Sequence, residues 1–496
     1  MNFLSLFVVI PVLMMLGLWI ARNMNQIRTV MVTGASLLLA LAVYLICAYC
    51  SERATGNTAE MLFTDSRVWY ESLHIHYAIG VDGISVVMLL LSAIIVFTGV
   101  FASWRMSPLP KEFFLWFCLL STGVFGFFIS VDLFTMFLFY EVALIPMYLL
   151  IGVWGSGKKE YSAMKLTLML MGGSAFILMG ILGIYFGAGE TTMNLTELAK
   201  IQIPVELQRI FFPMTFVGFG VLGALFPFHT WSPDGHASAP TAVSMLHAGV
   251  LMKLGGYGCF RIAMYLMPEA AHEQAWIFLI LTATGVIYGA FAACVQKDLK
   301  YINAYSSVSH CSLVLFAILM MTRVSSTGAI LQMLSHGLMT ALFFALIGMI
   351  YGRTHTRDIR EMGGLMKIMP FLAVCYVIAG LANLGLPGLS GFVAEMTIFV
   401  GSFEVNDVFH RTITVIACTS IVVTAVYILR LIGKILYGKV LDDHHLRLKD
   451  ATWDEKLTLI CLIVSVAGLG LFPLGFSNII HESVLPVIAQ LLTFNS

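Results

Sequence analysis

The sequence has very little charge. Only 11% of its 496 residues are Asp, Glu, Lys or Arg, and the 27 basic residues balance the 27 acidic ones. A soluble domain typically carries about 25% charged residues. Because 59% of the residues are hydrophobic, too few charges remain to cover so much apolar surface in water. The composition therefore excludes a soluble enzyme, a disordered segment and a nucleic-acid-binding protein with a basic face, and it indicates a polytopic membrane protein.

The sequence also has few cysteines that could act together. Seven of the nine occur singly in or near apolar segments, and only Cys47 and Cys50 form a C-x-x-C pair. Two thiols are too few for an iron–sulfur cluster or a closed zinc site. No P-loop pattern occurs, and we expect neither nucleotide nor flavin to bind. We therefore predict no cofactor and no metal in this chain, with any redox chemistry in partner subunits.

Long apolar runs predict an all-α integral membrane fold with about fourteen transmembrane helices, because each crossing needs roughly 20 apolar residues. We expect one polytopic membrane domain over residues 1–496, ending in an interfacial helix at 478–496. The predicted spans are 2–20, 30–48, 79–101, 112–130, 132–154, 162–186, 208–229, 241–263, 274–294, 301–321, 326–350, 368–402, 410–437 and 457–477.

Lys and Arg concentrate in one set of alternate loops between these spans. That set includes Arg105, Lys158, Arg353 and the run from Arg430 to Lys456, whereas the opposite loops hold few basic residues. Loops rich in Lys and Arg face the cytoplasm. We therefore predict a multi-pass protein of the bacterial inner membrane, with both termini on the outer, periplasmic side.

Two of the predicted spans are interrupted by Gly and Pro. The seventh reaches Pro227 and continues into HTWSPDGHASAP, and the twelfth contains ANLGLPGLSG. Non-helical backbone at membrane depth is tolerated only where protein buries it or where it lines a wet cavity. Interruptions five spans apart predict two five-helix repeats, spans 4–8 (112–263) and spans 9–13 (274–437), with the second copy inverted.

Three charged residues lie deep inside predicted spans: Glu141, Lys253 and Glu395. A charge at the centre of a membrane helix costs about 2.5–3.5 kcal/mol on insertion scales, so such residues are functional candidates by default. The alternative is a structural charge pair between helices that fixes their packing.

Other polar residues extend this set. Lys165 lies about one turn inside its span and could instead reach the interface. Several histidines lie in the spans or at the interruption, and imidazole accepts and releases protons near neutral pH. Lys297 and Lys300, at the cytoplasmic end of the ninth span, could instead be residues of a solvated loop without a role in a proton path. We predict a proton path through Glu141, Lys165, His247, Lys253, His336 and Glu395, with His229, His310, Lys297 and Lys300 as candidate supporting residues.

Six segments together resemble the antiporter-like proton-channel subunits of NADH-quinone oxidoreductase, respiratory complex I, and the subunit M branch more than the L and N branches. They are GVDGIS at 80–85, FYEVALIPMYLLIGVWG at 139–155, PFHTWSPDGHASAPTAVSMLHAGVLMKLGGYG at 227–258, DLKYINAYSSVSH at 298–310, QMLSHGLMTALFFALIGMIYGRTHTRDI at 332–359 and LPGLSGFVAEMTIFVGSF at 386–403.

The resemblance implies a proton-translocating membrane subunit that is coupled to quinone reduction. It implies that FMN, iron–sulfur clusters and quinone are bound by partner subunits, and that sister subunits L and N are neighbours in the membrane. It also implies that Glu141 is the family's acidic residue of the fifth helix and that Lys165 is its lysine of the sixth helix. Lys253 matches the lysine of the eighth helix. His336 matches the histidine of the eleventh helix, and Glu395 matches the glutamate of the broken helix.

One position departs from the family pattern. The family usually has a lysine five residues before the Pro of P-[FL]-H, and this chain has Leu222 there. His247 and Lys165 are the candidate replacements for that lysine as partner of Glu141. The alternatives for the whole chain are a subunit of a multisubunit Mrp-type cation/proton antiporter, a subunit of a membrane-bound hydrogenase, and a structural scaffold without a proton path.

Overall fold

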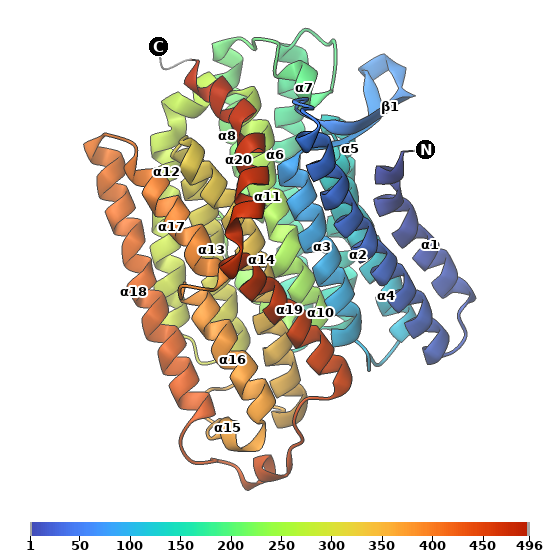
Figure 1. Cartoon of the computed structure of the whole chain (residues 1–496), viewed down its shortest axis with the longest axis vertical. Coiled ribbons are helices and arrows are strands. Elements are labelled where there is room, and N and C mark those ends of the chain that lie inside the picture. Colours follow the sequence, from blue (N-terminus) through green and yellow to red (C-terminus); the bar gives the residue numbers. More distant parts are fainter. Residues whose placement is uncertain (1, 494–496) are drawn as a thin grey trace.

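The computed structural model describes residues 2–493, and most of them lie in helices that run along the longest axis of the molecule (Figure 1). The N-terminal part also contains an antiparallel hairpin that was not predicted from the sequence. The end of its second strand falls within the predicted span 79–101. This part comprises η1 (Phe3–Ser5), α1 (Leu6–Ile20), α2 (Met24–Ala54), β1 (Leu62–Tyr70), η2 (Glu71–Leu73), β2 (Ile75–Val81) and α3 (Gly83–Ala102).

The next helices include the first interruption. The chain leaves helical structure after Leu222, and the predicted span 208–229 therefore ends too late. A non-helical stretch with Pro227 follows, since proline cannot continue a helix, and then comes the short helix α9 (Trp231–Ser238). This part comprises α4 (Pro110–Ile129), α5 (Leu133–Trp154), α6 (Lys159–Gly187), α7 (Leu195–Leu198), α8 (Val205–Leu222) and α9.

The predicted eighth span is one helical segment with two π-helical turns. It consists of α10 (Thr241–Leu246), the π-helical η3 (His247–Leu251), α11 (Met252–Gly258) and the π-helical η4 (Cys259–Met264). Single π-helical turns inside longer helices are frequent at functional sites.

The second half of the chain surrounds one long, central helix. This helix, α14, is 32 residues long, and 94% of its most apolar window is buried inside the protein. The predicted twelfth span is broken, as expected, between α16 and α17. The elements are α12 (Pro268–Val295), α13 (Leu299–Leu319), α14 (Arg323–Thr354), α15 (Leu365–Ile368), α16 (Pro370–Asn383), α17 (Ser390–Phe403) and α18 (Val408–Leu436).

The C-terminal part differs from the prediction. After η5 (Asp443–Arg447), helices α19 (Trp453–Leu471) and α20 (Pro473–Leu492) meet at a bend of 74°. The predicted boundary at 477 is therefore wrong, because Pro473 starts a new helix. In Figure 1, α20 runs along the bundle beside α14. The interfacial position of the segment 478–496 stays a prediction, and its residues 494–496 lie outside the described residues.

Eleven helices between residues 2 and 493 are long and apolar enough to cross a membrane, and the bent pair α19–α20 would make twelve. The segment α10–η4 and the pair α16–α17 consist of shorter pieces. The all-helical membrane fold is therefore confirmed, whereas the number fourteen stays a prediction.

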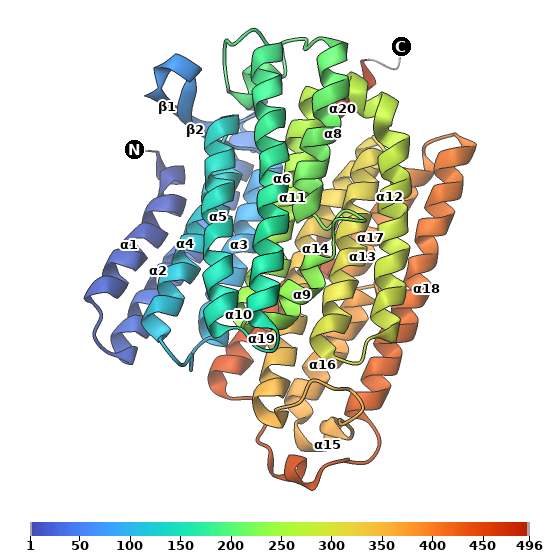
Figure 2. The same cartoon turned by 180° about the vertical axis from the view of Figure 1, so that it is seen from behind.

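The two ends of the bundle differ. The hairpin β1–β2 and the N-terminal start of the chain lie toward one end, and α15 and η5 lie at the opposite end (Figures 1 and 2). Below, these are called the hairpin end and the η5 end. Helices far apart in the sequence pack against each other in this arrangement, for example α3 with α19 and α12 with α18.

Candidate proton path

Lys253 lies at the centre of the polar interior. Its side chain projects from α11, and the residue is only 2% exposed. The Nζ atom donates to the Ala248 carbonyl oxygen at 2.6 Å and lies 2.7 Å from Nδ1 of His336 on α14. A buried ammonium group needs such partners, because its desolvation is otherwise uncompensated. The lysine and the histidine are thus in direct hydrogen-bond contact across two helices.

A second histidine continues the contact from His336 toward α17. The rings of His336 and His310 have centroids 5.3 Å apart. Nδ1 of His310 lies 3.5 Å from Oε1 of Glu395, a residue that is 8% exposed. Four sequence-predicted residues from four helices therefore form one line, Lys253–His336–His310–Glu395, which we call the central line.

Neutral polar side chains form hydrogen bonds around His310 in the central line. The amide oxygen of Asn383 lies 2.9 Å from Nε2 of His310, and the Gln332 side-chain amide lies 3.0 Å from its Nδ1. Tyr427 donates to Ser306 at 2.7 Å, and the amide group of Asn383 donates to the same hydroxyl at 3.2 Å. Both nitrogens of His310 are therefore used, which fixes the ring orientation between its two neighbours.

The break between α16 and α17 places Glu395. Gly385 has φ of +72°, and a Cβ atom there would lie 3.0 Å from Oε2 of Glu395. Only glycine adopts this backbone conformation without strain and leaves room for the carboxylate. The Gly/Pro interruption thus ends one helix and brings the glutamate against the histidines.

A separate ion pair lies nearer the η5 end. Nζ of Lys165 on α6 lies 2.7 Å from Oδ2 of Asp234 on α9, and the Tyr301 hydroxyl donates to Oδ1 at 2.9 Å. Asp234 and Tyr301 also line a cavity of about 670 Å³, together with Lys158, Tyr161 and Arg357. The side chains of the pair are 24% and 23% exposed, so the pair is reached from this cavity.

His247 lies in a cluster of aromatic rings between these two sites. Its ring stacks on Trp231 at 5.4 Å and lies 4.4 Å from the ring of His236. Nδ1 and Nε2 of His247 and Nδ1 of His236 are buried without a hydrogen-bond partner in the described structure. Nε2 of His236 is 3.3 Å from the sulfur of Met252, the residue before Lys253.

Glu141 stands apart from all of these groups. It lies on α5, and its Oε1 atom is buried without a hydrogen-bond partner among the described residues. Within residues 2–493, no ion pair joins Glu141 to His247 or to Lys165, which is held by Asp234 instead. Leu222 is fully buried at the end of α8. Of the two residues suggested as replacements for the missing lysine, Lys165 is paired with Asp234, and His247 stacks on Trp231 without a hydrogen bond to Glu141.

The candidate supporting residues lie in three kinds of place. His310 belongs to the central line. His229 is buried in the first interruption and stacks on Phe226 at 5.4 Å. Lys300 is buried and donates to the Ala239 carbonyl oxygen at 2.7 Å, whereas Lys297 is exposed.

Sequence reasoning missed several polar residues at these sites. Asp234 and His236 both lie in the SPDGH segment of the first interruption, and Asn383 begins the second one. Their position in non-helical or short-helix segments at membrane depth was the available signal. Within residues 2–493, no group of three or more His, Cys, Asp or Glu side chains is arranged to hold a metal ion.

Comparison with known families decides where the chain belongs. The family model described as "NADH:quinone oxidoreductase/Mrp antiporter, TM" matches residues 130–422, which is more than half of the chain. The chain belongs to this family. The resemblance found in the six sequence segments is therefore confirmed.

Curated relatives extend the match over nearly the whole chain. NAD(P)H-quinone oxidoreductase chain 4 1 of Synechococcus sp. (strain JA-3-3Ab) is 34% identical over 98% of this chain and 93% of its own length. NADH-quinone oxidoreductase subunit M of Rickettsia conorii is 32% identical over 97% of both chains. In respiratory complex I from Thermus thermophilus with bound NADH, one chain superposes with a TM-score of 0.89 at 26% identity, covering 98% of this chain and 99% of that one.

Proposed function

We propose that this chain is the proton-translocating membrane subunit of a complex I-type NADH:quinone oxidoreductase, of the subunit M type. The central line Lys253–His336–His310–Glu395 is the observation that carries the proposal. In this account the chain performs no redox chemistry, and it carries out the translocase half of the activity of the whole complex. FMN, iron–sulfur clusters and quinone belong to partner subunits, and the sister subunits L and N are its neighbours in the membrane.

The central line can move a proton because its members are coupled. Lys253 and His336 share a 2.7 Å contact, so a proton can pass from the ammonium group to the imidazole. The Glu395 carboxylate next to His310 favours a positive charge on that ring, and a protonated Glu395 does not. A change of charge at one end of the line therefore alters the proton affinity at the other end.

Protons reach this line, in our proposal, from the cavity of about 670 Å³ at the η5 end. Asp234 lines the cavity and forms an ion pair with Lys165, and the Tyr301 hydroxyl donates a hydrogen bond to Asp234. His236 and His247 follow, and their unpaired nitrogens offer positions for bridging water. His247 lies six positions before Lys253, so this route ends at the central line. Glu141, His229 and Lys300 are proposed as accessory groups of the same route.

The charge distribution supports the proposed membrane orientation. The loops at the η5 end carry most of the Lys and Arg, so we propose that this end faces the cytoplasm and the hairpin end faces the outside. We further propose that residues 112–263 and 274–437 are inverted repeats. The break between α8 and α9 and the break between α16 and α17 support this, because each lies in the corresponding span of its repeat.

The family also contains Mrp antiporter subunits, so the alternative activity is cation/proton exchange. The names and the coverage of the relatives favour the quinone oxidoreductase. Purification of the chain in mild detergent separates the possibilities. Quinone-site and NADH-module subunits in the purified assembly support the proposal. Small antiporter subunits would indicate an Mrp-type antiporter instead, and a nickel-binding subunit would indicate a membrane-bound hydrogenase.

The direct test compares two glutamates nine positions apart. Glu395→Gln removes the ionisable end of the central line, and Glu404→Gln changes an exposed residue after the same helix. In the intact complex in proteoliposomes, we expect Glu395→Gln to lower the proton-pumping rate by about tenfold or more, because one acid–base group is lost. Equal pumping by the two variants would contradict the proposed path.

A further inference from the structure

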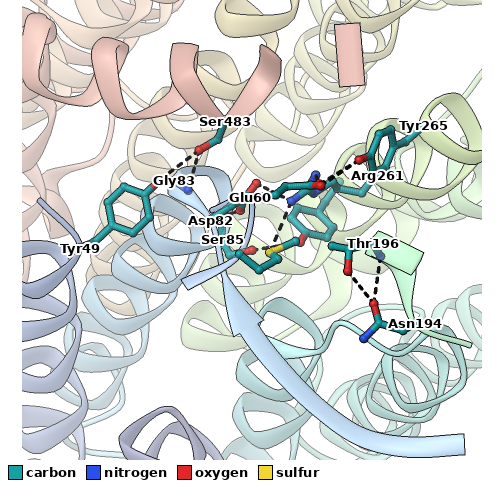
Figure 3. Close-up of polar contacts among 12 residues, drawn as sticks. Tyr49, Glu60, Asp82, Gly83, Ser85, Asn194, Thr196, Arg261, Tyr265 and Ser483 are labelled. Atoms are coloured by element: carbon teal, nitrogen blue, oxygen red, sulfur yellow. Dashed lines mark hydrogen bonds and ion pairs between the residues drawn. The ribbon is translucent and has the colours of Figure 1, made fainter. Parts of the chain in front are cut away.

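A buried ion cluster lies at the hairpin end, outside the path described above. Arg261 on η4 is 0% exposed, and its Nη2 atom lies 2.6 Å from Oδ2 of Asp82 (Figure 3). Its Nη1 atom lies 3.3 Å from Oε1 of Glu60, in the loop before β1. The Tyr265 hydroxyl lies 3.0 Å from both carboxylate oxygens of Glu60. Three elements far apart in sequence thus meet around one guanidinium group.

The charges of this cluster do not balance. Two carboxylates face one guanidinium group, and the carboxylate left without a matching charge in the cluster is that of the partly exposed Glu60. Nε of Arg261 is buried and has no hydrogen-bond partner in the described part of the chain. A purely structural ion pair would need only Asp82, since the residue is 1% exposed and is already matched by Arg261. The surplus carboxylate can instead be neutralised by one proton.

Hydroxyl groups connect the cluster inward to the helical segment that carries Lys253. Tyr257 lies four residues after Lys253, which is about one helical turn. Its hydroxyl is 3.0 Å from the hydroxyl of Ser85. The backbone N–H of Ser85 donates to Oδ1 of Asp82 at 2.8 Å, so Asp82 both caps α3 and faces Arg261. Polar groups therefore lead from one turn beyond Lys253 to Asp82.

The cluster is also connected outward. Glu60 lines a cavity of about 350 Å³ together with Arg53, Glu482 and Ser483. Its side chain is 24% exposed, whereas that of Asp82 is 1% exposed. Of the two carboxylates held by Arg261, one is therefore buried and the other reaches an open cavity at the hairpin end. On the orientation proposed above, this cavity faces the outer side of the membrane.

We propose that Asp82 and Glu60, held together by Arg261, form an outward-facing proton-release site for this subunit. The inference rests on the proposed proton-translocating function and adds a release route at the end of the eighth span. In this proposal Asp82 takes up one proton from the hydroxyl side of Tyr257 and Ser85 through bridging water, because the backbone N–H of Ser85 keeps its proton, and the cluster becomes neutral. Glu60 then gives one proton to water in the outer cavity and returns to carboxylate. Arg261 keeps its protons and acts as a positioning residue.

The first experiment removes the proton-carrying capacity without removing the hydrogen bonds. Glu60→Gln and Asp82→Asn still offer acceptor oxygens to Arg261, and Asn remains a good helix cap. In the intact complex in proteoliposomes, we expect either variant to lower protons pumped per electron, with the proton-transfer rate reduced about tenfold or more. Glu71→Gln, at the exposed tip of the hairpin, is the matched control and should pump like the wild type.

A structural role predicts a different result. It predicts less assembled complex in the Asp82→Asn variant, with an unchanged ratio of protons to electrons in the part that assembles. If the Asp82→Asn variant does not assemble, the Glu60→Gln variant decides between the two roles, because Glu60 is partly exposed and its substitution disturbs the packing less. A wild-type ratio in the Glu60→Gln variant overturns the proposal.

The second experiment tests the outer cavity without any pumping assay. Glu60→Cys is placed in a Cys47→Ser/Cys50→Ser background, because those two native thiols are exposed. We expect a membrane-impermeant thiol reagent to modify the new cysteine from the outer side only, and a Ser156→Cys variant in the η5-end cavity from the inner side only. Absence of outside labelling at position 60 would exclude a release site there.

The two levels of the account fail in different ways. If Lys253→Met stops pumping while Glu60→Gln does not change it, the proposed function stands and the release site is wrong. If neither variant changes pumping, the proposed function itself is wrong.

Discussion

His310 connects the two halves of the central line, and its removal gives a sharp prediction. His310→Phe keeps a ring of similar size but loses both nitrogens. The variant breaks the 2.9 Å and 3.0 Å contacts to Asn383 and Gln332 and the 3.5 Å contact to Glu395. His310 is the residue that contacts both His336 and Glu395 in the central line, so the variant removes the group through which a proton would pass between them.

The size of the effect follows from the contact that is lost. A hydrogen bond to a charged group contributes about 1.5–3 kcal/mol, and 1.4 kcal/mol corresponds to about tenfold in rate. We therefore expect proton pumping by the His310→Phe complex to fall by about ten- to a hundredfold. Oxidation of NADH with a soluble electron acceptor that bypasses the membrane subunits should stay unchanged, because this chain does not take part in that reaction.

The assay needs the assembled complex and a matched histidine. Pumping is measured in vesicles with a pH-sensitive dye, after assembly has been checked by native electrophoresis. His410→Phe replaces a histidine at the start of α18 that pairs with Asp407 near the end of the bundle, and it should pump normally. Wild-type pumping by an assembled His310→Phe complex would refute the connection between His336 and Glu395.

Three further predictions test neighbouring parts of the structure. Gly385→Ala should lower the proton-pumping rate, because a positive φ costs a non-glycine residue about 1–2 kcal/mol and the new Cβ would lie 3.0 Å from the Glu395 carboxylate. The control Gly433→Ala has open space around the new Cβ and should pump like the wild type. Asp234→Asn should slow pumping about tenfold, because Lys165 loses its ionic partner, whereas the exposed Asp443→Asn should not; equal rates would exclude the Lys165–Asp234 pair from the path. Leu222→Lys should assemble, because the new lysine would have Glu141 as its partner: Tyr140, next to Glu141, packs against Phe219, one turn from position 222. The double variant Leu222→Lys/Glu141→Gln should assemble poorly, because its buried lysine is unpaired. Equal amounts of the two assembled complexes would show that Glu141 is out of reach of position 222.

Much of the fold could be predicted because a membrane-spanning helix needs a long run of apolar residues, which can be read from the sequence. The long spans α1 to α6 and α12 to α14 coincide with apolar runs, and Gly385 and Pro387 marked the broken helix correctly. The hairpin β1–β2 was missed because its second strand, Ile75–Val81, is continuous with the apolar start of α3. The bend at Phe472 was missed because apolar residues continue on both sides of it, and only Pro473 marks the break.

The site was predictable in its members more than in its connections. Depth in a span was sufficient to select Lys253, His336 and Glu395, because a charged or polar group there is costly. Sequence spacing could not show that His310, from another helix, stands between His336 and Glu395. It also could not show that Lys165 pairs with Asp234 instead of Glu141, since the pairing depends on where the short helix α9 lies.

The arrangement around Glu141 deserves comparison with the second half of the chain. Glu395 has His310 beside it, whereas Glu141 in the first half of the chain has an unpaired buried oxygen in the described structure. Leu222 lies at the position where the family usually has lysine. The two halves are therefore chemically unequal in this subunit. On the proposed account the second half and the central line carry the larger share of proton transfer.

The measurement that tests the central claim most directly is the number of protons translocated per electron by the intact complex carrying Lys253→Met, in proteoliposomes with NADH and quinone. The substitution leaves an unbranched apolar chain in the place of the ammonium group that contacts His336 at 2.7 Å. The account predicts that this ratio falls below that of the wild type while the complex remains assembled. An assembled Lys253→Met complex with the wild-type ratio and the wild-type turnover would contradict it.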